Sequence, residues 1–264
     1  SKWDECIMFC PKTASGYELP RVVKPELTEL KSVAPPERQA VVAVYDFPDL
    51  TGQRKDKDNL ASFSTAVTQG STALLIDALK VAGNGSWFKV VERNRIDDLA
   101  KERQIVRQTR EEYLGKDANK LEPMLFAGIV LQGGIIGYDS STKSGGIGAR
   151  WLGIGAQTQY QSDTVTVTLR TVSVNTGEVL TTVTVTKTVL SYMDKLGVLK
   201  FVSNGETALE LETGFSINES INKATDLAVK AAVVGTIREG VRKGYWSYKK
   251  PAEPEVQTYP LIKK

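Results

Sequence analysis

A strict alternation of residue types between positions 152 and 161 constrains the fold of this chain more than any other feature. A period of two is typical of a β-strand with one apolar face and one polar face. Such strands occur in soluble antiparallel sheets and in the walls of water-filled membrane pores. The even positions are Leu152, Ile154, Ala156, Thr158 and Tyr160, and the odd positions are Gly153, Gly155, Gln157, Gln159 and Gln161.

A second alternating segment lies at residues 191–215, and the Ser-Asn-Gly sequence at 203–205 predicts a turn within it. Each arm has about 9–11 residues, the length that a tilted strand needs to cross a bilayer. We therefore predict two amphipathic hairpins, at 141–161 and 191–215. In the last arm the polar face carries Glu206, Glu210 and Glu212, and the apolar face carries Leu209, Leu211 and Phe215.

One chain with two hairpins cannot close a membrane barrel by itself, because the smallest barrels have about eight strands. Open strand edges in lipid would leave backbone groups without hydrogen-bond partners, at a cost of several kcal/mol each. No run of about 18 apolar residues predicts a transmembrane helix. If the hairpins insert, several copies of the chain must share one barrel.

The rest of the chain predicts an α+β fold, a mostly antiparallel sheet with helices on one face. We assign residues 39–140, 162–190 and 216–246 to this α/β domain, 1–38 to an extended proline-rich N-terminal arm, and 247–264 to a C-terminal tail. Strands are expected at 40–47, 87–93, 125–139, 164–174 and 179–190, and helices at 64–83, 95–109 and 218–242.

Composition excludes several classes of function. The 264 residues include no histidine and two cysteines, Cys6 and Cys10, which argues against most transition-metal sites and against histidine-dependent nucleophilic triads. The net charge of +3 does not indicate a nucleic-acid partner. The glycines at 145–155 do not predict a phosphate loop, because such a loop opens a helix and a strand pattern follows here. We expect no enzyme, no catalytic residue, no metal and no cofactor.

In its central stretches the chain resembles the CsgG-type curli secretion channels, a family of outer-membrane lipoproteins. The resemblance covers about residues 40–245 in the same order, and GARWLGIGAQTQYQ at 148–161 is its most specific part. Further matching stretches are VVAVYDFPDLTGQ (41–53), SFSTAVTQGSTALLIDAL (62–79), WFKVVERNRIDDLAKER (87–103), GGIIGYDSSTKSGGI (133–147), TGEVL (176–180) and KTVLSY (187–192).

The resemblance implies a homo-oligomeric ring of roughly nine subunits in the bacterial outer membrane, with two hairpins per subunit in a shared β-barrel and the α/β domains in the periplasm. It also implies a secreted unfolded polypeptide, accessory proteins and the lipid bilayer as partners, and a lipidated N-terminal cysteine. Cys10 follows Ile7, Met8 and Phe9 rather than the small residues of a lipidation signal. One hypothesis is that the lipidated cysteine precedes Ser1.

The resemblance further places a pore constriction in the loop at 51–64, where the family has a Tyr, an Asn and a Phe. Phe63 matches the phenylalanine, Ser62 takes the asparagine position, and the tyrosine position falls at Lys57 or Asp58. The alternative for Phe63 is inward packing at the start of the following helix. The predicted constriction residues are Lys55, Asp56, Lys57, Asp58, Asn59, Ser62 and Phe63.

Two hypotheses of different class follow. The first is a channel that passively exports unfolded curli-like amyloid subunits, and the second is a soluble periplasmic lipoprotein that regulates a cell-wall enzyme. They differ in whether 141–161 and 191–215 insert into lipid. In the first, Gln157, Gln159, Gln161, Glu206, Glu210 and Glu212 line the pore, and Leu152, Ile154, Tyr160, Leu209, Leu211 and Phe215 face lipid.

Overall fold

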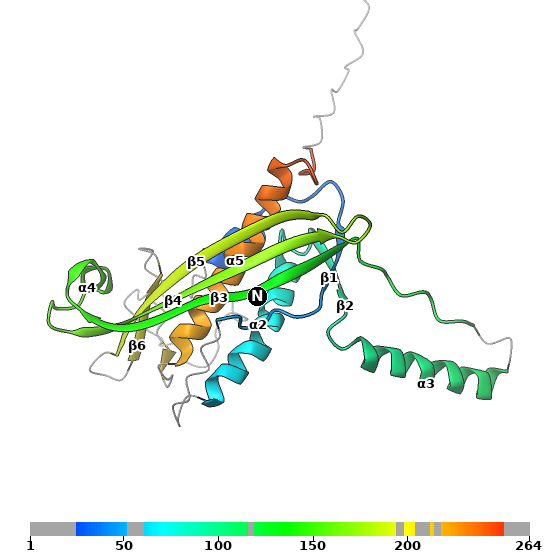
Figure 1. Ribbon diagram of the computed structural model, residues 1–264, viewed down its shortest axis with the longest axis horizontal. Helices are drawn as coiled ribbons and strands as arrows, with labels where there is room; N and C mark the ends of the chain where they lie inside the picture. Colours follow the sequence, from blue (N-terminus) through cyan, green and yellow to red (C-terminus); the bar gives the residue numbers. More distant parts are fainter. Residues whose placement is uncertain are drawn as a thin grey trace, which may run out of the picture.

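A computed structural model describes residues 25–51, 61–115, 119–193, 198–203, 212–213 and 218–250 of the chain (Figure 1). Its helices are α1 (Pro25–Ser32), α2 (Ala61–Val81), α3 (Ile96–Leu114), α4 (Gly146–Leu152) and α5 (Asn218–Arg242). Its strands are β1 (Ala40–Val44), β2 (Phe88–Glu92), β3 (Ile129–Ser144), β4 (Gln159–Ser173), β5 (Val179–Met193), β6 (Val198–Ser203) and β7 (Glu212–Thr213).

The described strands form one mixed sheet in the order β2-β1-β3-β4-β5-β6-β7. β1 runs parallel to β2 and β3, and every later neighbour is antiparallel. β3, β4 and β5 are much longer than the others, and Figure 1 shows them continuing past the helices toward α4. The predicted α+β class, with a mostly antiparallel sheet, is therefore confirmed for the described residues.

The main core lies between one face of the sheet and helices α1, α2 and α5. In β4, Val165, Val167 and Leu169 are fully buried. The threonines between them face the other side, where Thr166 pairs with Thr186 of β5 at 2.9 Å between hydroxyl oxygens. Burial of β-branched side chains on one face and cross-strand pairs on the other stabilise the long ladder.

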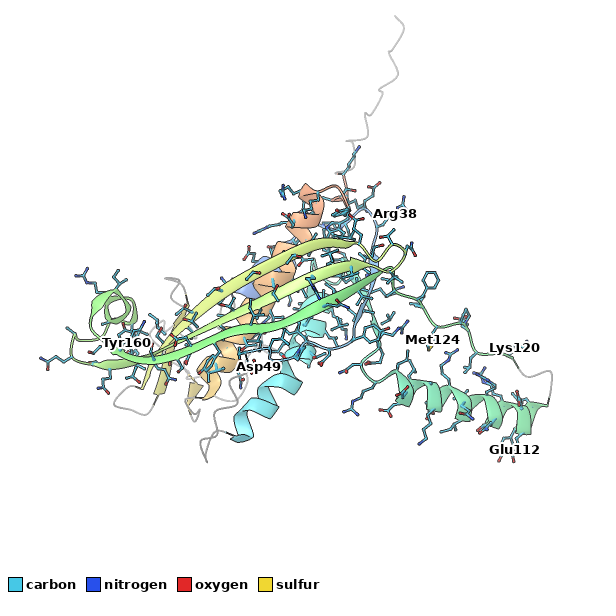
Figure 2. The ribbon with its side chains drawn as sticks, viewed as in Figure 1. Arg38, Asp49, Glu112, Lys120, Met124 and Tyr160 are labelled. Carbon is cyan, nitrogen blue, oxygen red and sulfur yellow. The ribbon has the colours of Figure 1, made fainter. Side chains whose placement is uncertain are left out.

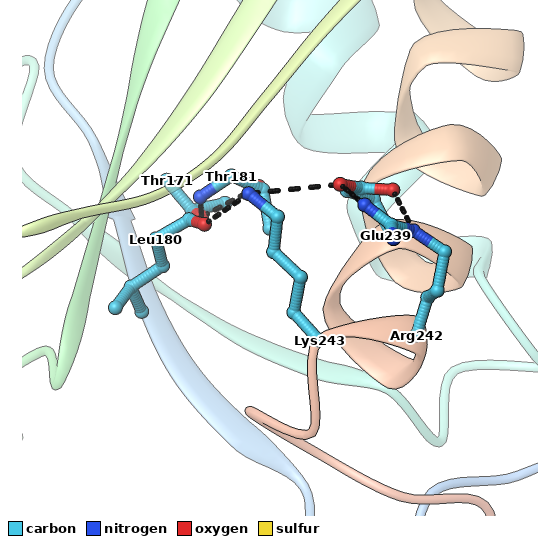
Figure 3. A network of polar contacts seen from close by, with 6 residues as sticks. All are labelled: Thr171, Leu180, Thr181, Glu239, Arg242 and Lys243. Atoms are coloured by element: carbon cyan, nitrogen blue, oxygen red, sulfur yellow. Dashed lines mark hydrogen bonds and ion pairs between the residues drawn. The ribbon is translucent and has the colours of Figure 1, made fainter.

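The C-terminal end of α5 is fixed to the start of β5 by a small polar network (Figure 3). The Lys243 ammonium donates to the Leu180 carbonyl at 3.2 Å and lies 3.6 Å from the Glu239 carboxylate. Arg242 donates two hydrogen bonds to Glu239, which lower the pKa of that carboxyl group. Exposed ion pairs of this kind stabilise a fold only slightly, so the apolar core holds α5 on the sheet.

The prediction of an extended N-terminal arm is wrong for part of its length, because the arm contains α1. The signal for this helix is Pro25 at its first position, where proline is favoured. Leu30 of α1 is fully buried in the main core. The segment after α1 packs against the chain beyond α5, with Glu37 N–H donating to the Ser247 carbonyl at 2.8 Å and Lys249 N–H to the Pro35 carbonyl at 2.8 Å.

Candidate functional site

The chain leaves β1 through a segment that is tied to the middle of α2. Thr72 of α2 accepts a hydrogen bond from Phe47 N–H at 3.0 Å, and the neighbouring Ser71 hydroxyl donates to the Phe47 carbonyl at 2.6 Å. Phe47 itself is buried in the main core. The two hydroxyls form hydrogen bonds with the N–H and carbonyl groups of Phe47, which have no partner in a neighbouring strand. They therefore fix where the following loop begins.

The same segment is also bonded to β3. Leu50 N–H donates to the Ile135 carbonyl at 2.8 Å, and Ile135 N–H donates to the Pro48 carbonyl at 3.0 Å. A side chain at Gly134 would meet the Pro48 carbonyl oxygen and would lie 3.1 Å from Leu50. Glycine is therefore required where the two backbones approach each other.

The loop after Thr51 is the predicted constriction. Asp49, labelled in Figure 2, accepts hydrogen bonds from Thr51 N–H at 2.9 Å and from the Thr51 hydroxyl at 2.6 Å, which form a local turn at residues 49–51. Lys55, Asp56, Lys57, Asp58 and Asn59 lie outside the described residues, and Ser62 and Phe63 lie in the first turn of α2, where side chains are not described. Their role in a constriction stays a prediction.

The first predicted hairpin is present, but its connection is longer than the alternation indicated. β3 and β4 pair as far as Ser144 and Gln159, and α4 with the turn after it fills the space between them. The continuous strand predicted from Leu152 is therefore wrong up to residue 158. Gly145, Gly146 and Gly153 have φ values of 67°, 69° and 69°, which are incompatible with an extended strand.

The predicted apolar face of this segment forms a second, smaller core. Leu152 and Tyr160 are buried together with Ala149 of α4 and Leu190 of β5, and Ile154 packs against them. The Tyr160 hydroxyl donates to the Gly145 carbonyl at 3.2 Å, and its ring occupies the place of a side chain at Gly148. The glycine-rich segment does open a helix, contrary to the prediction, and Gly148 serves this packing.

Two of the three glutamines on the predicted polar face are exposed on the hairpin surface. Gln157 and Gln159 are exposed, whereas Gln161 is half-buried and donates to the Ser140 hydroxyl at 3.0 Å. Ser140 donates to the buried carboxylate of Asp163 at 2.6 Å. Burial raises the pKa of nearby Tyr138; a hydrogen bond with Ser140 lowers it, and the charge of Asp163 raises it further.

The second predicted hairpin is described only in part. β5 continues to Met193, and β6 pairs with it and with β7, which contains Glu212. The side chain of Glu212 is not described, and Glu206, Glu210, Leu209, Leu211 and Phe215 lie outside the described residues. The lining and lipid-facing roles of these side chains stay predictions.

Among the described residues, no helix is long and apolar enough to span a membrane. The same part of the chain contains no group of three or more histidine, cysteine, aspartate or glutamate side chains that could hold a metal ion.

Comparison with known proteins decides the family. The family described as curli production assembly/transport component CsgG matches residues 24–259. The chain belongs to the CsgG family. Curli production assembly/transport component CsgG from Escherichia coli K12 is 39% identical over 252 residues, which is 94% of this chain and 88% of the relative. The Citrobacter koseri protein of that name is 39% identical over 251 residues, with the same shares covered.

CsgG proteins are transport components rather than a family of enzymes. Among solved structures, the PelC dodecamer from Paraburkholderia phytofirmans aligns with a TM-score of 0.33 and 12% identity, over 76% of this chain and 91% of that chain. A superposition this loose supports no conclusion, and the assignment to the CsgG family depends on the sequence matches.

Proposed function

We propose that this chain is a subunit of an outer-membrane secretion channel that passively exports unfolded curli-like amyloid subunits. The CsgG relatives support the transport role. The observation that carries the proposal is the β3–β4 ladder, which continues to Ser144 and Gln159 beyond the last core residues of β3. Only the small core around Tyr160 is packed on this extension, whereas a membrane hairpin needs strands of that length.

Insertion requires the hairpin to lengthen. The arms are already paired at Ser144 and Gln159, so opening the turn at residues 145–158 would extend them without changing register. Leu152, Ile154 and Tyr160 would then leave their contacts with Leu190 of β5 and face lipid. Gln157, Gln159 and Gln161 would line the pore, joined by the glutamates of the second hairpin.

A single subunit contributes too few strands for closure, so the channel must be a ring whose subunits share one barrel. We propose roughly nine copies, with the α/β domains in the periplasm and a lipid anchor before the described residues. Polypeptide would pass the constriction loop after Thr51 and leave through the barrel. Export would be driven by confinement in the vestibule or by capture outside, with accessory proteins on either side.

We expect Phe63→Ala to raise the single-channel conductance, because removing an aromatic ring from every subunit widens a constriction built from identical residues. Phe63→Trp should lower the conductance by the same logic. The measurement is current recording at fixed voltage on each variant in a planar bilayer.

Thermal unfolding of both variants provides the control, since a Phe63 side chain packed into the protein would affect stability. Equal conductance in the wild type and both variants, with lowered unfolding temperatures, would show that Phe63 packs inward and does not line the pore.

A further inference from the structure

The segment between β2 and β3 projects from the body of the molecule as an arm, defined here as α3 together with the return segment 119–126. Figure 1 shows the arm standing away from the sheet and from the other helices. Figure 2 places Glu112 and Lys120 at its far end and Met124 on the return segment. The arm leaves from β2, which is an edge strand of the sheet.

Three arginines, one just before α3 and two within it, bond to the return segment. Arg93 donates to the Leu125 carbonyl at 2.8 Å, Arg103 to the Glu122 carbonyl at 2.7 Å, and Arg110 to the Asn119 carbonyl at 2.8 Å. Hydrogen bonds from charged donors are the stronger ones. The arm is therefore a defined structure with a fixed surface rather than a loose loop.

α3 itself is a charged helix, and a few apolar side chains of the arm are exposed. α3 contains no buried residue, and Phe126 is 84% exposed, next to the half-exposed Leu125. At the tip of the helix Tyr113 is 77% exposed. Neighbouring exposed apolar side chains, such as Leu125 and Phe126, mark interaction surfaces.

We propose that the arm docks on a second copy of this chain, with Leu125 and Phe126 covering Tyr45, Leu50 and Ile136 of the neighbouring copy. This inference rests on the proposed ring. A ring closes through contacts between two unlike surfaces of the same chain, and the chain carries two such surfaces. The arm is one of them, and the patch on the body is the other.

The body patch has the properties that the contact requires. Tyr45, Leu50 and Ile136 are each about half exposed. Leu50 and Ile136 lie together, because Leu50 N–H bonds to the carbonyl of Ile135 and its side chain lies over Gly134. Figure 1 shows the arm projecting away from the sheet.

Charge complements the apolar match. Arg93, at the base of the arm, is bonded to Leu125, whereas Asp46 and Asp49 flank Tyr45 and Leu50 on the body. The hydrogen bonds of Asp46 and Asp49 to Phe47, Thr51 and Thr72 use the Oδ1 atom of each carboxylate. Each Oδ2 atom can therefore accept from a neighbouring guanidinium, which favours this orientation of the two copies.

Photo-crosslinking of the full-length protein tests the contact directly. In the variant Phe126→p-benzoylphenylalanine, ultraviolet light should join two copies, and mass spectrometry should place the bond within residues 45–50 or at Ile136. A crosslink within one chain, to another part of the second copy or to another protein would overturn the proposal, as would its absence.

Assembly provides a second test. Phe126→Glu should raise the protein concentration needed for ring formation by more than about tenfold, while Tyr245→Glu, exposed on the body beyond α5, should leave it unchanged. Because Phe126 is exposed in the single subunit, the unfolding temperature of the Phe126→Glu subunit should equal that of the wild type. Rings from Phe126→Glu at wild-type concentrations would overturn the inference alone, whereas a wild type without rings would overturn the proposed function.

Discussion

Gly134→Ala should lower the free energy of unfolding by about 1–3 kcal/mol, the usual cost of forcing an extra carbon into a packed site. The new Cβ would collide with the Pro48 carbonyl oxygen and press on the Leu50 side chain. A backbone carbonyl cannot rotate away as the end of a side chain can. The hydrogen bonds between Ile135 and the segment 48–50 would therefore lengthen or break.

Denaturant unfolding measures the total effect, and hydrogen exchange at the Leu50 and Ile135 amides locates it. Gly155→Ala is the matched control, because its Cβ would lie at an ordinary 3.7 Å from the Thr158 hydroxyl. If both variants had the same stability and the same exchange rates, the result would contradict the close contact between β3 and the start of the loop.

Ile154→Lys should lower the fraction of protein inserted into membranes by at least about tenfold per subunit. A lysine on the lipid-facing side of a barrel strand costs up to about 2–4 kcal/mol, depending on its depth, and each 1.4 kcal/mol is a factor of about ten. The measurement is the fraction of protein that stays with liposomes after extraction with urea.

Gln157→Lys is the matched control for this experiment, since Gln157 is exposed and belongs to the proposed pore-lining face. It should insert as the wild type does. The unfolding temperature of each soluble subunit separates membrane effects from a loosened α4. Equal insertion of the two lysine variants would contradict the assignment of faces in this hairpin.

Regular elements with local signals could be predicted from the sequence. The Asn-Thr-Gly-Glu turn at 175–178 predicted the β4–β5 hairpin, and Gly177 has the positive φ of 72° that such a turn requires. The apolar spacing of residues 218–242 predicted α5 with its observed limits. In these elements the local pattern and the tertiary packing favour the same structure.

The tip of the first hairpin could not be predicted in the same way. Alternation alone assigned residues 152–158 to a strand, but three glycines with positive φ turn the chain at the two ends of α4. The apolar residues of the pattern are nevertheless buried, because they pack against Leu190 of β5. That contact depends on where β5 lies in the sheet, which no local pattern contains.

The residues that fix the start of the predicted constriction loop also escaped prediction. Ser71 and Thr72 resemble ordinary residues of a helix in the sequence, and their bonds to Phe47 appear only when β1 and α2 are packed together. Asp163 interrupts an alternating strand as a buried carboxylate, which was a signal for a polar contact of the kind it makes with Ser140.

Single-channel recording of the full-length protein in a planar bilayer tests the central claim most directly. We expect discrete, uniform conductance steps from the assembled protein, and brief blockades when an unfolded polypeptide is added without nucleotide. Membrane-bound protein that passes no current, or current that unfolded polypeptide never blocks, would contradict the claim that this chain forms a secretion pore.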